Sequence, residues 1–335
     1  MSTDSTVQDT QEQQQRIRLR AGRASLVMAV AILALKLAGW WFTGSVAILS
    51  DALESLVNVT SAGFLMFSLH LASQPPDHNH PYGHGKIEYF AAALEGVMVL
   101  AAAVSILISA TLALWRQEAP HDLGQGLLLT GLATVLNFAL GRYLIATGRR
   151  THSPALVSDG VHVMSDVITS VAVLVGVALV FATGWGFLDP IVALVAGGAI
   201  GWTGIHLVRT AVAGLMNQVD EQALHRIVAA LEDHGEPAAI QVHQLRAWTA
   251  GAEVNVDFHL AVPAYWTVAR AHDLGDQMAA RVRKAFPGPC DVIVHLDPCE
   301  PHLCRWCQMP ECQQRTAPFV ERPRQDLAGM RGAPL

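Results

Sequence analysis

Six long apolar stretches in the first two-thirds of the chain constrain its fold more than any other feature. A helix needs about 20 residues to cross the hydrocarbon core of a bilayer, and the stretches are close to or above that length. Six buried helices of a large soluble protein are the less favoured alternative, because stretches such as residues 97–114 lack the polar stripe of a surface helix. We therefore predict six transmembrane helices, over residues 25–42, 45–71, 90–114, 126–146, 156–182 and 187–213.

The composition agrees with a membrane protein and argues against two other classes. Only 15% of the 335 residues are charged and 52% are hydrophobic, whereas a soluble domain carries about 25% charged residues. The formal net charge of −6 provides no basic surface of the kind that nucleic-acid-binding proteins use, so no nucleic-acid partner is expected. Residues 1–15 are polar and Gln-rich rather than a signal peptide, which argues against a secreted, disulfide-linked protein.

The basic residues near the helix ends predict the orientation in the membrane. Loops that carry Lys and Arg stay on the cytoplasmic side, and the intervening loops here are poor in both. We expect a multi-pass protein of the cell inner (plasma) membrane, surrounded by lipid, with both termini cytoplasmic. The residues that support this are Arg16, Arg18, Arg20 and Arg23 before the first span, Lys86 after the second, and Arg149 and Arg150 after the fourth.

The composition changes near residue 216 to that of an ordinary soluble domain. Its pattern is helix, two alternating strands, helix and strand, which suits a small α+β sandwich. The predicted elements cover residues 220–234, 240–248, 253–262, 266–286 and 291–296. The predicted domains are a polar tail (1–20), a six-helix membrane domain (21–215), a cytoplasmic α+β domain (216–298) and a Cys-containing tail with little regular structure (299–335).

Two predicted spans carry polar side chains at matching spacings. Glu54 and Asn58 lie four residues apart in the second span, and His162 and Asp166 do so in the fifth. Residues at this spacing share a helix face, so two packed helices would direct four oxygen and nitrogen ligands at one point. Such a set suits a tetrahedral divalent transition metal. The alternative is a polar seam that holds the two helices together by hydrogen bonds.

Other ionisable residues in the spans receive weaker interpretations. Asp51 lies about one turn before Glu54, and Asp159 lies about one turn before His162. We expect both to line an access path rather than to bind metal. Lys36, Glu95 and Arg209 are isolated in the sequence, and we interpret them as helix-end or structural groups.

The loop after the second span holds a further cluster. Asp77, His80 and His84 lie in a segment bent by Pro and Gly, and their side chains are suitable metal ligands. The cluster predicts a second, peripheral metal site, with simply solvated His residues as the alternative.

All five cysteines follow residue 289. Cys290 stands alone and is expected to be a small buried residue. Thiols stay reduced in the cytoplasm, which favours metal over disulfides in the tail. Cys304-x-x-Cys307, with Cys312 and either His302 or Cys299, would supply a closed four-ligand zinc site; a redox pair or a flexible metal-capturing arm remains the alternative.

The chain as a whole resembles the cation diffusion facilitator family. The resemblance rests on the six spans, the paired motifs, the Pro-Tyr-Gly-His-Gly-Lys loop at 81–86 and the C-terminal domain. Within that family they are most similar to the bacterial ferrous-iron/zinc efflux type, over about residues 20–298. The resemblance implies a transporter, not an enzyme. It would work as a homodimer that exports divalent metal in exchange for protons, with metallochaperone-like, ferredoxin-like cytoplasmic domains.

The resemblance also implies the metal sites. It places the transport site at Glu54, Asn58, His162 and Asp166, a second site at Asp77, His80 and His84, and a binuclear cytoplasmic site at His243, His259, His272, His295 and Asp297. For the last site the residues agree in part, because alternate residues of a strand share a face and His295-Leu-Asp297 has that spacing.

Two departures from the family pattern bear on the choice of metal. The family usually has Asp or His at position 54 and Asp at position 58, whereas this chain has Glu54 and the neutral Asn58. Zinc tolerates such a mixed tetrahedral set and is the expected substrate and structural ion. Iron(II), cobalt, cadmium and manganese, and the proton stoichiometry, stay open at this stage.

Two rival functions fit less well. An intramembrane metallohydrolase would need a general base beside an open metal position, typically on a His-Glu-x-x-His helix, and no such string occurs. A non-transporting membrane metal sensor would use the His residues and the Cys tail, but no recognisable signalling module follows residue 298.

Overall fold

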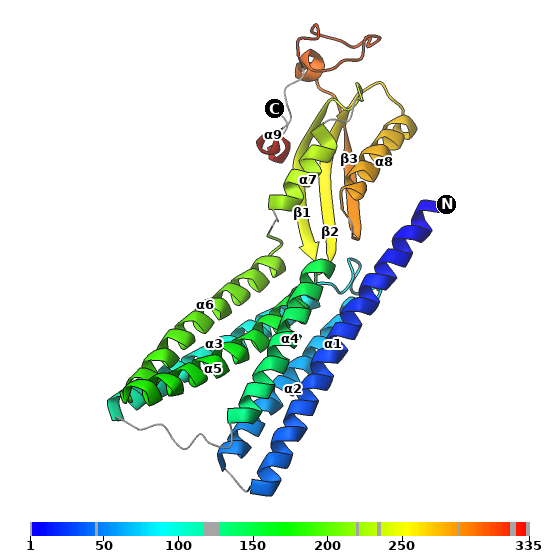
Figure 1. The fold of residues 1–335 in the computed structure, drawn as a ribbon. Coiled ribbons are helices and arrows are strands. Elements are labelled where there is room, and N and C mark those ends of the chain that lie inside the picture. Colours follow the sequence, from blue (N-terminus) through cyan, green and yellow to red (C-terminus); the bar gives the residue numbers. More distant parts are fainter. Residues whose placement is uncertain are drawn as a thin grey trace. The chain divides into compact units, whose positions relative to one another are not determined.

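The computed structural model describes residues 2–43, 46–116, 127–218, 221–232, 236–286, 288–321 and 326–332. The chain forms two compact units, one from Gln8–Met216 and one from Asn217–Leu335 together with Met1–Val7. Figure 1 shows that the first unit consists of long helices and that the second combines helices with a sheet.

Long helices form the first unit. They are α1 (Ser2–Thr43), α2 (Val46–Ala72), α3 (Ile87–Arg116), α4 (Leu127–Thr151), α5 (Pro154–Thr183) and α6 (Leu188–Leu215). Among the described residues, the segments long and apolar enough to cross a membrane are Ser55–Ala72, Ile87–Trp115, Pro154–Thr183 and Leu188–Leu215. The remaining predicted spans, 25–42 and 126–146, coincide with α1 and α4, whose described residues do not meet that measure.

The helices pack through glycine, alanine and leucine residues, and many other large side chains lie on the outside. α3 lies along α6, and α4 lies along α5 (Figure 1). A Cβ atom at Gly148 of α4 would lie 2.8 Å from the backbone nitrogen of Val157 in α5, so only glycine permits this approach. Large side chains such as Phe181 and Trp202 are exposed, as lipid-facing residues are in a membrane protein.

The start and end of α5 are fixed locally by its sequence. The Ser153 hydroxyl accepts a hydrogen bond from the Leu156 N–H at the N-terminus, and Pro154 occupies the first turn. Gly184 ends the helix with a positive φ of 75° and donates its N–H to the Val180 carbonyl. These caps define the helix that carries two of the predicted transport-site residues.

The second unit has the predicted α+β composition. Its elements are α7 (Glu221–Glu232), β1 (Gln241–Ala250), β2 (Glu253–Val262), α8 (Val268–Lys284), β3 (Cys290–Pro298), a 3-10 helix η1 (Pro301–Arg305) and α9 (Leu327–Arg331). The strand order is β1-β2-β3, with β1 antiparallel and β3 parallel to β2. Each predicted helix and strand is present, within a few residues of its expected bounds.

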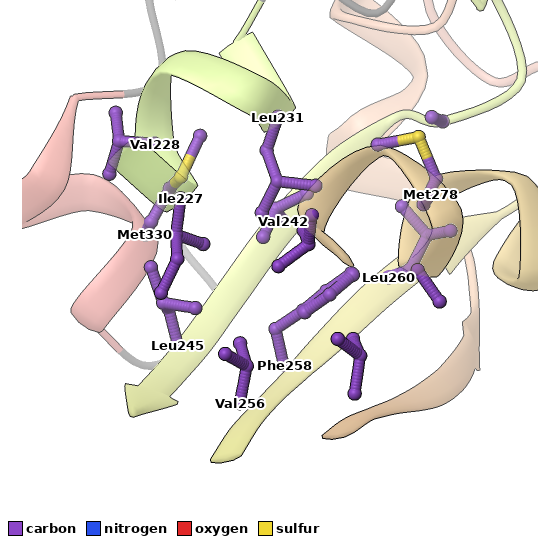
Figure 2. Packing of buried hydrophobic residues seen from close by; sticks show 14 of the residues in the cluster. Ile227, Val228, Leu231, Val242, Leu245, Val256, Phe258, Leu260, Met278 and Met330 are labelled. Atoms are coloured by element: carbon purple, nitrogen blue, oxygen red, sulfur yellow. The ribbon is translucent and has the colours of Figure 1, made fainter. Parts of the chain in front are cut away.

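The core of this unit lies on one face of the sheet. Ile227 and Leu231 of α7 and Met278 of α8 pack against Phe258 and its strand neighbours (Figure 2). Because successive strand residues point to opposite faces, the residues between them, including His259, face away from α7 and α8.

The described part of the tail has little regular structure, as predicted, but one of its two short helices docks on the core. It contains η1 and α9, and Met330 of α9 is fully buried in the core beside Ile227 and Leu245 (Figure 2). A five-residue helix is too short to show a hydrophobic periodicity, so the sequence pattern does not predict α9. The helix is held in place by the contact of Met330 with the core.

Candidate metal sites

Side chains from α2 and α5 meet within the helical unit. The Asn58 amide nitrogen donates a hydrogen bond to Asp166 Oδ2 at 3.1 Å, and the Asn58 Oδ1 atom is 3.2 Å from His162 Nε2. His162 is 8% exposed. Three of the four predicted transport-site residues are thus brought together, while the side chain of the fourth, Glu54, lies outside the described residues, as does that of Asp51.

A carboxylate from a third helix also reaches this cluster. Glu95 of α3 is 3% exposed, its Oε2 atom is 3.6 Å from His162 Nδ1, and its Oε1 atom accepts a hydrogen bond from the Ser61 hydroxyl. The sequence interpretation of Glu95 as an isolated group missed this contact. One sequence signal was available: an ionisable side chain inside an apolar span is costly and therefore suggests a function. The sequence could not show its partners, because they lie on other helices.

Asp159 is buried one turn away from His162. It is 2% exposed, and its Oδ2 atom accepts a hydrogen bond from the Ser25 hydroxyl of α1 at 2.7 Å. The carboxylate therefore links α5 to α1. The sequence predicts that Asp159 lines an access path, whereas in the structure its carboxylate makes a buried contact between two helices.

The loop between α2 and α3 forms a compact three-residue cluster. His80 Nδ1 is 3.1 Å from Asp77 Oδ1, and His84 Nε2 is 3.2 Å from Asp77 Oδ2 and 3.1 Å from His80 Nδ1. The three ligand atoms lie within 4.8 Å of one another. The backbone N–H of His80 donates to Asp77 at 2.7 Å and lowers the pKa of that carboxyl group, which keeps it in the charged, metal-binding form.

A second cluster lies on the open face of the sheet. His243, His259 and His295 are neighbours in the strand register, one on each strand. The Asp297 carboxylate lies among them, with its Oδ2 atom 3.2 Å from His243 Nε2 and 2.9 Å from His259 Nδ1, and its Oδ1 atom 3.2 Å from His295 Nε2. Burial lowers the pKa of His243, which favours the neutral imidazole that binds metal.

His272, the fifth predicted residue of this site, lies elsewhere. It is exposed on α8, where its Nδ1 atom is 3.3 Å from Asp276 Oδ2. Because α8 packs on the opposite face of the sheet, a single chain does not join His272 to the other four residues.

Comparison with known proteins identifies the family. Residues 23–216 match the model of the cation efflux transmembrane domain, and residues 219–299 match that of the cation efflux protein cytoplasmic domain. The chain belongs to the cation diffusion facilitator family. The predicted resemblance is therefore confirmed, and with it a multi-pass membrane protein of a cation efflux transporter family rather than an enzyme family.

Alignments with similar members of the family cover most of the chain. An uncharacterized transporter of Synechocystis sp. is 41% identical over 283 residues, covering 82% of this chain and 89% of the relative. The cation-efflux pump FieF of Escherichia fergusonii is 31% identical over 288 residues, covering 85% and 94%. FieF of Klebsiella pneumoniae is also 31% identical, over 287 residues, covering 84% and 93%.

The cysteine tail of this family member follows the end of the second match at residue 299. Cys304 and Cys307 are buried, and Cys299 and Cys312 are half-buried. The N–H and hydroxyl of Thr316 donate to Cys304 Sγ at 3.5 and 3.4 Å and lower the pKa of that thiol. Burial raises the pKa of Cys299, and the neighbouring Cys307, Cys304 and Cys312 add to the rise.

Arg315 holds the tail in this path. Its guanidinium group donates to the carbonyl oxygens of Cys304 at 3.0 Å, Cys307 at 2.9 Å and Met309 at 2.8 Å. His302, the other predicted tail ligand, has its Nδ1 atom 3.3 Å from Glu300. Among the described His, Cys, Asp and Glu residues, only the loop and sheet clusters bring three ligand atoms within 4.8 Å of one another, so the tail zinc site stays a prediction.

Proposed function

We propose that this protein exports divalent transition metal, with zinc as the preferred substrate, from the cytoplasm in exchange for protons. The observation that carries the proposal is the meeting of Asn58, His162 and Asp166 between α2 and α5. It occurs in a chain of the cation diffusion facilitator family with FieF relatives named as cation-efflux pumps.

The chemistry of the cluster suits reversible metal binding. Zinc accepts a mixed set of nitrogen and oxygen ligands in tetrahedral geometry. The cluster offers an imidazole nitrogen, an amide oxygen and a carboxylate oxygen, and Glu54, one turn before Asn58, would be the fourth ligand. Ligands must be deprotonated to bind metal, so binding and proton release are linked. Alternating access would load the site from the near-neutral cytoplasm and release metal where protons are more abundant.

The membrane placement follows from the same proposal. Arg149 and Arg150 at the end of α4, and Lys86 just before α3, lie at helix ends that the charge rule assigns to the cytoplasm. We propose the plasma membrane, with both termini in the cytoplasm. Metal would then enter the transport site from the side that carries the C-terminal domain.

The peripheral clusters support a homodimer with additional bound metal. We propose that Asp77, His80 and His84 bind one ion and that the sheet cluster around Asp297 binds another. His272 faces away from the cluster of its own chain, so it would contribute only to metal bound between two copies. The ion at the sheet cluster would stiffen or bridge the two C-terminal domains rather than cross the membrane.

The decisive experiment is a flux assay with purified protein in proteoliposomes. A pH gradient, acidic on the side that receives the metal, should drive zinc flux in the wild type. His162→Ala and Asp166→Ala should abolish that flux while retaining folding, and His80→Ala, which alters only the loop cluster, should retain it. Absence of gradient-driven flux for zinc, iron(II), cobalt, cadmium and manganese would refute the proposal. Flux without any partner protein would exclude a non-transporting sensor.

A further inference from the structure

The contact between Glu95 and His162 involves a helix that the paired motifs of α2 and α5 do not include. His162 has two ring nitrogens, and they face different groups: Nε2 faces Asn58 Oδ1 at 3.2 Å, and Nδ1 faces Glu95 Oε2 at 3.6 Å. The side of the ring that faces the proposed metal ligands is therefore Nε2. The opposite side faces a carboxylate from α3.

We propose that Glu95 is a positioning residue for transport, which holds the Nδ1–H side of the His162 ring and keeps Nε2 directed at the metal. This inference rests on the proposed function. Without metal, Asn58 Oδ1 can accept a hydrogen bond from an Nε2 N–H. When metal occupies Nε2, the ring proton lies on Nδ1, where an N–H is attracted to the Glu95 carboxylate and a lone pair would be repelled. Carboxylates that contact the far nitrogen of a metal-binding His fix its tautomer and orientation in this way.

The position of Glu95 is itself fixed by α2. Ser61 donates its hydroxyl hydrogen to Glu95 Oε1, which leaves Oε2 directed at His162. Asn58 and Ser61 are three residues apart and share a face of α2. One face of α2 thus carries both Asn58, a proposed ligand, and Ser61, which orients the Glu95 carboxylate. The contacts form a continuous chain from Ser61 to Glu95, His162 and Asn58.

The burial of Glu95 supports a specific role. Its side chain is 4% exposed, and that of His162 is 10% exposed. An ionisable group in a transmembrane segment is costly and needs a compensating contact. Glu88 near the start of α3 is equally buried, but it contacts Arg18 and Ser153 instead, so it provides a matched carboxylate on the same helix that does not touch His162.

The test compares Glu95→Gln in two backgrounds. One is the wild-type site, and the other is His162→Gln, in which the amide oxygen takes the place of Nε2 and no Nδ1–H remains. Zinc affinity is measured by chelator competition in full-length protein carrying His80→Ala, His259→Ala and Cys307→Ala, which silence the peripheral sites. The KM and maximal rate of zinc flux are measured in parallel, without these three substitutions.

We expect Glu95→Gln to weaken zinc binding about 10- to 100-fold and to raise KM more than it lowers the maximal rate. In the His162→Gln background the further loss should be under about 2-fold, because the group on which Glu95 acts is gone. Glu95→Asp should restore part of the affinity. Glu88→Gln should lower stability through its contact with Arg18 but leave the zinc affinity of the folded protein unchanged.

Two results would overturn the inference: unchanged zinc affinity in Glu95→Gln, or an equal loss in both backgrounds. If Glu95→Gln does not fold, Ser61→Ala replaces it in the same comparison and should give a smaller loss with the same dependence on His162. Failure of the proposed function is distinguishable, because it would appear as absent wild-type flux, whereas failure here leaves wild-type flux intact.

Discussion

At the scale of single residues, one amide joins the other two residues of the proposed membrane site. Asn58 donates to Asp166 through its nitrogen and presents its oxygen to His162. A carboxylate in its place could only accept hydrogen bonds. The neutral amide therefore lets α2 and α5 approach without metal and limits the negative charge available to a bound cation.

Asn58→Asp tests this role of the amide. The substitution places a second carboxylate about 3 Å from Asp166, where two like charges repel each other unless a cation lies between them. We expect the KM for metal to fall at least about tenfold, since opposite unit charges about 4 Å apart attract by about 4 kcal/mol at an effective dielectric constant of about 20. We also expect the order of preference among metals to change. Flux assays with zinc, iron(II), cobalt, cadmium and manganese measure both. An unchanged preference would show that the amide does not set selectivity.

A second residue-scale prediction concerns Glu253 at the start of β2. Burial raises the pKa of its carboxyl group above the ordinary 4.5, and Asp291 adds to the rise. The unfolded chain therefore loses this proton at lower pH than the folded chain, so the stability contributed by Glu253 is full below about pH 4.5 and declines as pH rises.

Glu253→Gln should remove this decline. We expect its melting temperature to exceed that of the wild type at pH 7 and the difference to shrink toward pH 4.5. Thermal unfolding of the full chain across this pH range measures the effect, with the exposed Glu311→Gln as a control. A difference that grows toward acidic pH would contradict the assigned direction.

At the scale of elements, buried polar contacts link the helix ends. Arg18 of α1 lies 3.7 Å from Glu88 of α3 and donates to the Thr151 carbonyl at the end of α4 at 2.6 Å. Ser153, which caps α5, donates to the same Glu88 carboxylate. Four helices therefore share one ionic contact, and Glu88 is only 1% exposed.

Arg18→Ala should destabilise the helical unit strongly. Removing one partner of a buried ion pair leaves an uncompensated charge, which costs about 3–5 kcal/mol. The control is Arg16→Ala, because Arg16 and Glu12 form an exposed pair on the same helix and such pairs contribute about 1 kcal/mol or less. Thermal or denaturant unfolding in detergent compares the two, and equal effects would show that the Arg18 contact is not important for stability.

The tail provides the second element-scale prediction. Arg315 and Thr316 hold the segment between Cys304 and Cys307 in a defined path with few buried apolar residues, and small segments of this kind need a metal or other cross-link. We expect one zinc ion in the tail. Cys304→Ser and Cys307→Ser should each lower the zinc content by one ion per chain, and Cys290→Ser should not. Equal zinc content in all three would favour a redox pair or a capturing arm.

At the scale of the whole molecule, the proposed metal sites lie in a membrane unit and in a C-terminal unit that have separate cores. The sheet cluster lies on the face that the helices α7 and α8 leave open. Metal held there stabilises the C-terminal unit by mass action, by about 2.7 kcal/mol when its free concentration is 100 times the dissociation constant.

His259→Ala should therefore reduce the zinc-dependent rise in the melting temperature of the full chain. His272→Ala should do the same only where two copies associate, so its effect should vanish on dilution to monomer. Calorimetry with and without zinc, at two protein concentrations, separates the two variants. A full zinc response in His259→Ala would rule out metal binding by the sheet cluster.

The sequence by itself determined the features that depend on local periodicity. A spacing of four residues placed His162 and Asp166 on one face of α5, and alternation placed His295 and Asp297 on one face of β3. The length of the apolar runs indicated the membrane unit, and turn and strand patterns indicated the α+β unit. Each signal is contained within a single element, so it is readable without knowledge of neighbours.

Only the tertiary structure decided which of these faces meet. Asn58 and Asp166 are 108 positions apart, and Glu95 joins His162 from a third helix on which no polar residue lies three or four positions from it. The docking of Met330 and the separation of His272 from the sheet cluster are likewise contacts between elements. Helix and strand periods fix the direction of a side chain on its own element, whereas its partner is chosen by how the elements pack.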